Sequence, residues 1–184
     1  MGSGASQLSP EKIAELKRKT PFEEQELTQL LKWYSLYDPS EDGSFGIPYN
    51  VLLKIPELST CHALPLVARL FINEETGTLG PEPFLYFCAA LSSKASVNAK
   101  RKFAFRCLDM ASKDHLEYDE VFRWYKLLYS GALSDDQIME VTLSTLHGPH
   151  VTTPGHMTYQ DFCKLVSDEE IINRFTVSLQ LASL

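Results

Sequence analysis

The sequence predicts an all-α protein made of four helix–loop–helix units arranged in two lobes. Helix-start signals recur along the chain, and the apolar residues between them repeat at helical rather than alternating spacing. In addition, each of the four loops carries one apolar residue shortly before the next helix. These residues lie 32 to 41 positions apart, and they are Ile47, Leu79, Leu116 and Met157.

Size and composition suit this architecture and exclude several functions. The chain has 184 residues, of which 44% are hydrophobic, so two small cores can be buried. The net charge of −7 argues against nucleic-acid binding, which needs a basic surface. No apolar run approaches the roughly 20 residues of a membrane span. The cysteines lack any Cys-x-x-Cys spacing and are expected to be buried thiols in a reducing, cytoplasmic compartment: Cys61, Cys88, Cys107 and Cys163.

Four helix starts have a capping signal. Each is a Ser or Thr that precedes a proline or a Glu/Gln three positions later, and the four predicted N-caps are Ser9, Thr20, Ser134 and Ser167. With the apolar stripes, these signals divide the chain into four parts. We expect an N-terminal extension over 1–25, lobes over 26–93 and 97–168, and a C-terminal tail helix over 169–184.

The third loop has the frame of a twelve-residue EF-hand calcium loop. Asp109 stands at position one and Glu120 at position twelve, with Glu117 at position nine. Positions three and five carry Ala111 and Lys113 in place of oxygen ligands. A unit charge about 5 Å from a divalent ion costs roughly 6 kcal/mol at an effective dielectric constant of about 20. We therefore predict no calcium binding at micromolar free calcium.

The other loops match the calcium-loop pattern less well than the third. The first starts well with Asp38, Ser40 and Asp42, but Tyr49 or Val51 stands where a bidentate carboxylate should close it. The second and fourth loops each keep one acidic ligand position. No cofactor is expected, and any calcium binding should be weak and confined to the third or first loop.

Lys113 suggests how the third loop is held without metal. We hypothesise that its ammonium neutralises Asp109 or Glu120; the alternative is a solvated surface lysine. The fourth loop holds His147, His150 and His156, but it has no cysteine or carboxylate at a suitable spacing, so we interpret these as surface histidines rather than a zinc site. No catalytic motif is present, and we expect no enzymatic activity.

Several segments resemble the calcineurin B-like EF-hand proteins, most closely the calcium- and integrin-binding branch. They are MGSGASQLSPEKIAEL at the start, TPFEEQEL from Thr20, KIPEL from Lys54, KFAFRCLD from Lys102 and INRFTVSL near the end. The resemblance implies a calmodulin-like array of four EF-hands, with short β-bridges between paired loops. It also implies an N-myristoylated adaptor that holds a target helix in an apolar groove, for which its own C-terminal tail competes.

Aromatic residues supply candidates for that groove. The segment VFRWYKLLY is apolar around more than half of its circumference, more than one buried face requires. The groove candidates are Phe122, Trp124, Tyr125, Leu128, Tyr129, Trp33 and Tyr34. The tail candidates are Ile171, Phe175 and Leu179. The alternative for both sets is that they belong to the core.

The start MGSGAS matches the N-myristoylation pattern, with Gly2 as the acceptor. Because one acyl chain anchors only weakly, the basic run from Lys17 to Lys19 would have to assist at a membrane surface. The favoured function is a largely calcium-independent adaptor. Its partner would be a channel or receptor tail, a kinase or phosphatase subunit, or a cytoskeletal protein. The alternatives are a calcium-sensing regulatory subunit and a structural subunit of a cytoskeletal or axonemal assembly, located at the cytoskeleton or flagellum.

Overall fold

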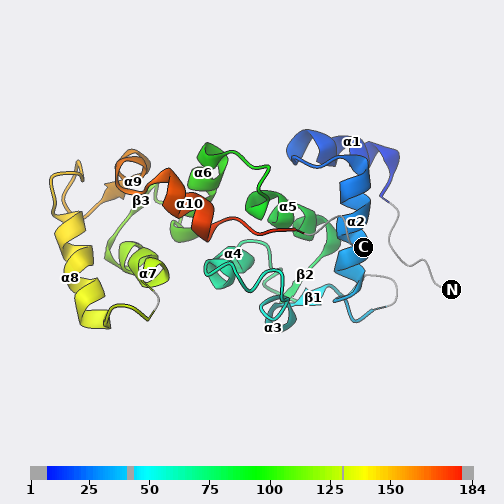
Figure 1. Cartoon of the computed structure of the whole chain (residues 1–184), viewed down its shortest axis with the longest axis horizontal. Coiled ribbons are helices and arrows are strands. Elements are labelled where there is room, and N and C mark those ends of the chain that lie inside the picture. Colours follow the sequence, from blue (N-terminus) through cyan, green and yellow to red (C-terminus); the bar gives the residue numbers. More distant parts are fainter. Residues whose placement is uncertain (1–7, 41–43, 130, 180–184) are drawn as a thin grey trace. The chain divides into compact units, whose positions relative to one another are not determined.

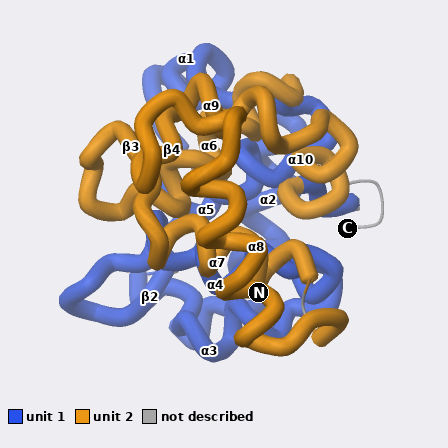
Figure 2. The backbone as a smooth tube through the Cα atoms, turned by 90° about the vertical axis from the view of Figure 1, so that its left-hand side faces the viewer, with its two compact units in different colours: residues 1–95, 176–184 blue, residues 96–175 orange. Residues whose placement is uncertain are grey.

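The computed structural model describes residues 8–40, 44–129 and 131–179. The chain divides into two compact units, one formed by residues 1–95 with 176–184 and the other by residues 96–175 (Figure 2). The described residues are mostly helical, as predicted (Figure 1). None of the helices in these ranges combines the length and the apolar character that crossing a bilayer would demand.

The first unit contains two helix–loop–helix motifs preceded by an additional helix. Its helices are α1 (Pro10–Lys19), α2 (Glu24–Ser35), α3 (Tyr49–Leu52), α4 (Leu64–Arg69) and α5 (Pro81–Leu91). Its strands are β1 (Ile47–Pro48) and β2 (Thr78–Leu79). Phe84 on α5 packs against Trp33 and Tyr34 of α2, with ring centroids 5.4 and 5.3 Å apart. These rings join α2 to α5 in the core of the unit.

The second unit repeats the plan and adds a helix at its end. Its helices are α6 (Val97–Leu108), α7 (Tyr118–Leu128), α8 (Asp135–Leu146), α9 (Tyr159–Leu165) and α10 (Asp168–Arg174). Its strands are β3 (His115–Leu116) and β4 (Met157–Thr158). Phe162 of α9 packs against Phe105 and Trp124, at centroid distances of 5.6 and 5.3 Å. The core therefore lies where α6, α7 and α9 meet.

The loops pair as the sequence predicts. In the first unit Ile47 lies opposite Leu79, and in the second Leu116 lies opposite Met157, in antiparallel two-stranded ladders. All four side chains are at most 3% exposed. The predicted apolar residue of each loop therefore joins neighbouring loops over the core, and the β-bridge prediction is confirmed.

Three of the four predicted N-caps are confirmed, and one is wrong. Ser9, Ser134 and Ser167 each accept a backbone hydrogen bond at the start of a helix. Thr20 instead ends α1, and its hydroxyl donates to the Leu16 carbonyl at 2.8 Å. Pro21 explains why α1 ends here, because a residue before proline is disfavoured in the α region, and Thr20 is extended with φ −128°. Helix α2 starts after Glu23, whose backbone N–H donates to Glu26 at 3.0 Å.

The C-terminal segment differs from the single tail helix expected over 169–184. Helix α10 ends at Arg174, and Phe175 leaves the helical conformation with φ −119° and ψ 28°. Residues from Thr176 onward belong to the first unit, where the Val177 N–H donates to the Leu91 carbonyl at 2.9 Å. The β-branched pair Thr176 and Val177 favours extended backbone over a longer helix. Residues 180–184 lie outside the described residues.

Candidate functional site

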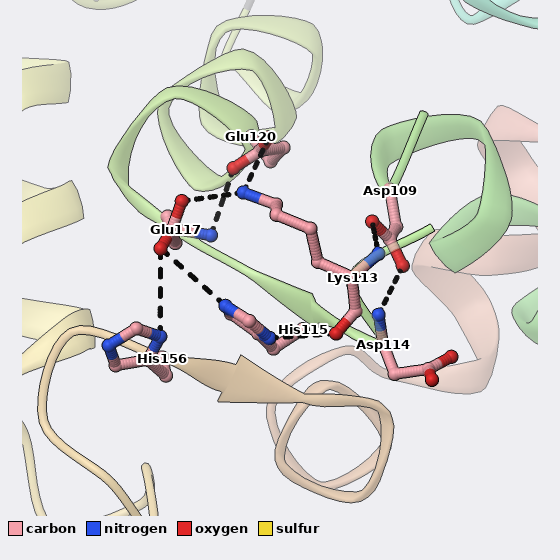
Figure 3. Close-up of polar contacts among 7 residues, drawn as sticks. All are labelled: Asp109, Lys113, Asp114, His115, Glu117, Glu120 and His156. Atoms are coloured by element: carbon pink, nitrogen blue, oxygen red, sulfur yellow. Dashed lines mark hydrogen bonds and ion pairs between the residues drawn. The ribbon is translucent and has the colours of Figure 1, made fainter. Parts of the chain in front are cut away.

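The third loop keeps the calcium-loop shape through its own hydrogen bonds. Asp109 is 7% exposed, and its two carboxylate oxygens each accept a backbone N–H at 2.8 Å, from Lys113 and Asp114 (Figure 3). Asp114 has φ 62° at the position where a calcium loop has glycine. Aspartate is one of the few residues that tolerate this left-handed region. The sharp turn therefore forms without glycine, with its first carboxylate held by backbone donors of the loop itself.

Lys113 brings its ammonium to the closing end of the same loop. Its Nζ lies 2.5 Å from Glu117 Oε2 and 3.3 Å from Glu120 Oε1 (Figure 3). The hydrogen bond from Lys113 lowers the pKa of Glu117, and Glu117 in turn raises the pKa of Lys113. The Lys113 ammonium therefore lies beside Glu120, one of the two carboxylates expected, and also beside Glu117, as the hypothesis of an internal cation requires. For Asp109 it is wrong, because that carboxylate is held by backbone amides instead.

The first loop is closed around Asp38 in a similar way. Asp38 Oδ1 accepts from the Ser40 N–H and hydroxyl, at 2.8 and 2.6 Å. Oδ2 accepts from the Tyr34 hydroxyl and the Gly46 N–H, both at 2.9 Å. Burial alone would raise the pKa of Asp38, but these hydrogen bonds outweigh burial and the pKa is lowered. The third candidate ligand of this loop, Asp42, lies outside the described residues.

The fourth loop has a polar cluster that was not predicted from the sequence. Asp161, at position twelve, is 0% exposed. Its Oδ1 accepts from the Thr152 hydroxyl at 2.8 Å, and its Oδ2 from the Thr158 hydroxyl at 2.7 Å. Both threonines occupy calcium-ligand positions, three and nine. Counting positions marks Thr152, but only the fold shows that its hydroxyl is used by the carboxylate.

Most of the predicted groove residues are covered by other side chains. Trp33, Tyr34, Trp124 and Leu128 are at most 9% exposed. Trp124 is stacked on Phe175 at a centroid distance of 6.3 Å, in addition to its contact with Phe162. Of the other candidates, Phe122 and Tyr125 are half-buried and Tyr129 is 39% exposed. In the described conformation, α7 thus presents only part of the predicted apolar surface.

The predicted tail residues lie in different surroundings. Ile171 and Phe175 are both fully buried, and Phe175 also meets Phe103 edge to face at 6.3 Å. Leu179 is half-buried in the first unit. The lipidation candidate Gly2 lies outside the described residues. Of the basic run, Lys17 and Lys19 form ion pairs with Glu23 and Glu15 at the end of α1.

Paired loops within four helix–loop–helix units define a calcineurin B-like EF-hand fold. The chain is 25% identical over 179 residues to the calcineurin B protein of Naegleria gruberi, an alignment that covers 97% of this chain and 100% of that protein. It is 27% identical over 163 residues to the type 2 calcineurin B protein of Dictyostelium discoideum, covering 88% and 87% of the two chains. Both relatives are named as subunits of calcineurin. No protein-family model matches the chain. These relatives support the calcineurin B-like resemblance, while the calcium- and integrin-binding branch stays a prediction.

Proposed function

We propose that this protein is a non-catalytic regulatory or adaptor subunit that binds an amphipathic helix of a larger protein without requiring calcium. The observation that carries the proposal is the ammonium of Lys113 beside Glu117 and Glu120, where a calcium ion would be coordinated. An EF-hand loop that contains its own cation keeps its shape at any calcium concentration. The likeness to proteins named as calcineurin subunits, over nearly the whole chain, supports the role of a subunit.

The partner surface is assigned to apolar side chains that remain exposed on the second unit. They are Tyr129 after α7, Met139 and Leu143 on α8, and Ile172 on α10, each 39% to 45% exposed. Met139 and Leu143 are four residues apart and so share one helix face. A helix with apolar residues at the same spacing is the natural ligand of such a face. A kinase or phosphatase subunit best fits the likeness to calcineurin B proteins among the expected partners.

The C-terminal segment is proposed to control access to a deeper part of this surface. Phe175 covers Trp124, the most enclosed aromatic side chain of the predicted groove on α7. Displacing Phe175 would uncover the Trp124 ring for a partner side chain. The same contact equally makes Phe175 a core residue, and truncation of the chain after Arg174 separates the two roles.

Affinity capture of the full-length chain from native cells, with and without a calcium chelator, tests this function. We expect the same partner in both conditions, identified by mass spectrometry. The double variant Met139→Glu/Leu143→Glu should lose it, whereas Leu36→Glu, at an apolar position of the first unit that is more exposed still, should retain it. Partner binding that requires calcium would instead support the calcium-sensing alternative.

We further propose a cytoplasmic location, with attachment to membranes where Gly2 is acylated. Mass spectrometry of the native N-terminus and fractionation of a Gly2→Ala variant test this. An unmodified N-terminus, or unchanged membrane association in the variant, would contradict it. Retention in the cytoskeletal fraction would support the structural-subunit alternative.

A further inference from the structure

Two histidines and a glutamate meet where the third and fourth loops pair. His115 Nε2 lies 3.5 Å from Glu117 Oε1, and His156 Nδ1 lies 3.7 Å from the same oxygen (Figure 3). The two imidazole rings are 4.7 Å apart between centroids. Within the described ranges, one potential ligand atom from each of these three residues falls within 4.8 Å of the others.

The loop pairing explains why these residues meet. His115 lies opposite Thr158 and Leu116 opposite Met157, so the next pair outward is Glu117 and His156. Residues two apart on a strand point to the same face, which places His115 beside Glu117. The expectation that His156 has no carboxylate at a suitable spacing holds only within the fourth loop. The structure corrects it, because the third loop supplies the carboxylate and a second histidine.

The hydrogen bonds around the cluster prepare it for a metal. His115 Nδ1 lies 2.9 Å from the Lys113 carbonyl, which is only an acceptor, so Nδ1 is the donor and Nε2 is the nitrogen left to bind a metal. In metal-binding histidines the ring nitrogen that does not bind the metal commonly donates a hydrogen bond to a carbonyl or carboxylate, which fixes the orientation of the ring. Two ligands about 2.0 to 2.1 Å from a tetrahedral ion lie about 3.3 Å apart, close to the two distances observed.

Charge and access also suit a divalent ion. Glu117 uses Oε2 for Lys113 and turns Oε1 toward the histidines. The Lys113 ammonium is itself offset by Glu120 at 3.3 Å. The side chains of His156 and Glu117 are each 46% exposed, so an ion can enter and water can complete its coordination.

We propose that His115, Glu117 and His156 form a binding site for a transition-metal ion of the zinc type. Two imidazoles and one carboxylate are a ligand set that zinc takes in proteins, with a fourth position open. Calcium is disfavoured here, because it prefers oxygen ligands and a higher coordination number. The site uses side chains at positions seven and nine of the third loop and position seven of the fourth, and it does not need the oxygen ligands that the third loop lacks at positions three and five. A bound ion would connect the third loop to the fourth.

Titration of the reduced full-length chain with zinc chloride tests the proposal by calorimetry. We expect one zinc site. His115→Ala and His156→Ala should each lower the zinc affinity at least about tenfold, because replacing even a residue that only hydrogen-bonds a metal ligand typically lowers affinity by that factor. His147→Ala and His150→Ala are matched controls in the fourth loop, and Cys163→Ser excludes the half-buried thiol. All three should bind zinc like the unmodified chain, and millimolar calcium should not displace the ion.

Two further measurements distinguish loss of the site from loss of the fold. Circular dichroism in a chelator should be the same for all variants, because the altered side chains are partly exposed. The cobalt complex should show tetrahedral absorption without a thiolate band. The proposal is overturned if the chain binds no zinc, if both cluster variants bind it normally, or if the cysteine variant alone abolishes binding.

Discussion

Among single residues, three carboxylates show how side chains and backbone of the protein hold the loops. Asp38, Asp109 and Asp161 each stand at a calcium-ligand position and are each at most 7% exposed. A buried carboxylate is costly unless its oxygens accept hydrogen bonds. All three obtain them from hydroxyls or backbone amides of their own loop. Hydroxyl and amide groups of the protein therefore stabilise these buried carboxylates by hydrogen bonding.

Replacing Lys113 by methionine should lower the melting temperature modestly. The substitution keeps the aliphatic stem but leaves Glu117 and Glu120 without the cation between them. Differential scanning calorimetry at low and high salt measures the effect, which should shrink as salt screens the charges. The control is Lys126→Met, whose ion pair with Asp135 joins two more exposed side chains and should matter less. Equal melting temperatures for Lys113→Met and the unmodified chain would refute the internal-cation role.

Asp161 should make stability depend on pH in the acid range. Burial alone would raise its pKa, but hydrogen bonds from Thr158 and Thr152 lower it from 3.8 to about 2. A carboxyl with a depressed folded-state pKa stabilises the fold above its unfolded pKa and loses this contribution as pH falls through the folded value. We expect Asp161→Asn to cost about 1 to 3 kcal/mol near neutral pH, because an amide donor would face hydroxyl donors.

Chemical denaturation of both proteins between pH 7 and pH 2 checks this. The stability difference should be constant down to about pH 4 and should shrink from there to about pH 2. Thr152→Val is a milder control, since it removes one of the donors to Oδ1 and keeps the carboxylate. A difference that does not vary with pH would show that Asp161 is not ionised in the folded protein.

Among the elements, α10 and the residue after it complete the second unit. Ile171 and Phe175 are fully buried, and Phe175 contacts both Trp124 and Phe103. Ile172, between them in sequence, is 41% exposed. The element therefore has one face in the core and one outside, as expected of a short amphipathic helix.

Phe175→Ala should destabilise the second unit by about 3 to 5 kcal/mol, as is typical when a buried phenylalanine is truncated. Trp124 would gain solvent contact, so its fluorescence should shift to longer wavelength. Ile172→Ala is the matched control and should change stability by no more than about 0.5 kcal/mol. Truncation after Arg174 distinguishes the two roles of the segment. A folded, tighter-binding product supports a displaceable tail, and an unfolded second unit supports a core residue.

In the molecule as a whole, the paired-loop architecture is present although several calcium-ligand positions carry other residues. The chain aligns with calcineurin B proteins over nearly its full length, at about 25% identity. The paired loops and apolar cores are present in both units. Cores tolerate substitution when volume and pattern are kept, whereas a calcium loop fails when single ligands are lost.

We expect calcium to leave the whole molecule unchanged. Addition of micromolar calcium should alter neither the tryptophan emission nor the melting temperature, since both Trp33 and Trp124 are enclosed and no loop is completed by the ion. The positive control is Ala111→Asp/Lys113→Asp, which supplies ligands at positions three and five of the third loop and should gain calcium binding. Calorimetry that detects a site tighter than about 10 μM in the unmodified chain would contradict the prediction.

Local pattern was sufficient to predict the helical class, the four units and the residues that pair between loops. These features depend on periodicity and on residue identity at counted positions, which need no knowledge of distant contacts. Thr20 marks the limit of such reasoning even locally, because its hydroxyl donates back to the end of α1 and the next helix starts only after Glu23.

Three contacts became visible only in the folded chain. Phe175 covers Trp124, Thr152 donates to Asp161, and His156 of the fourth loop meets His115 and Glu117 of the third. Each contact joins positions far apart in the chain or across a loop. They therefore depend on side-chain packing and orientation, which no local pattern specifies.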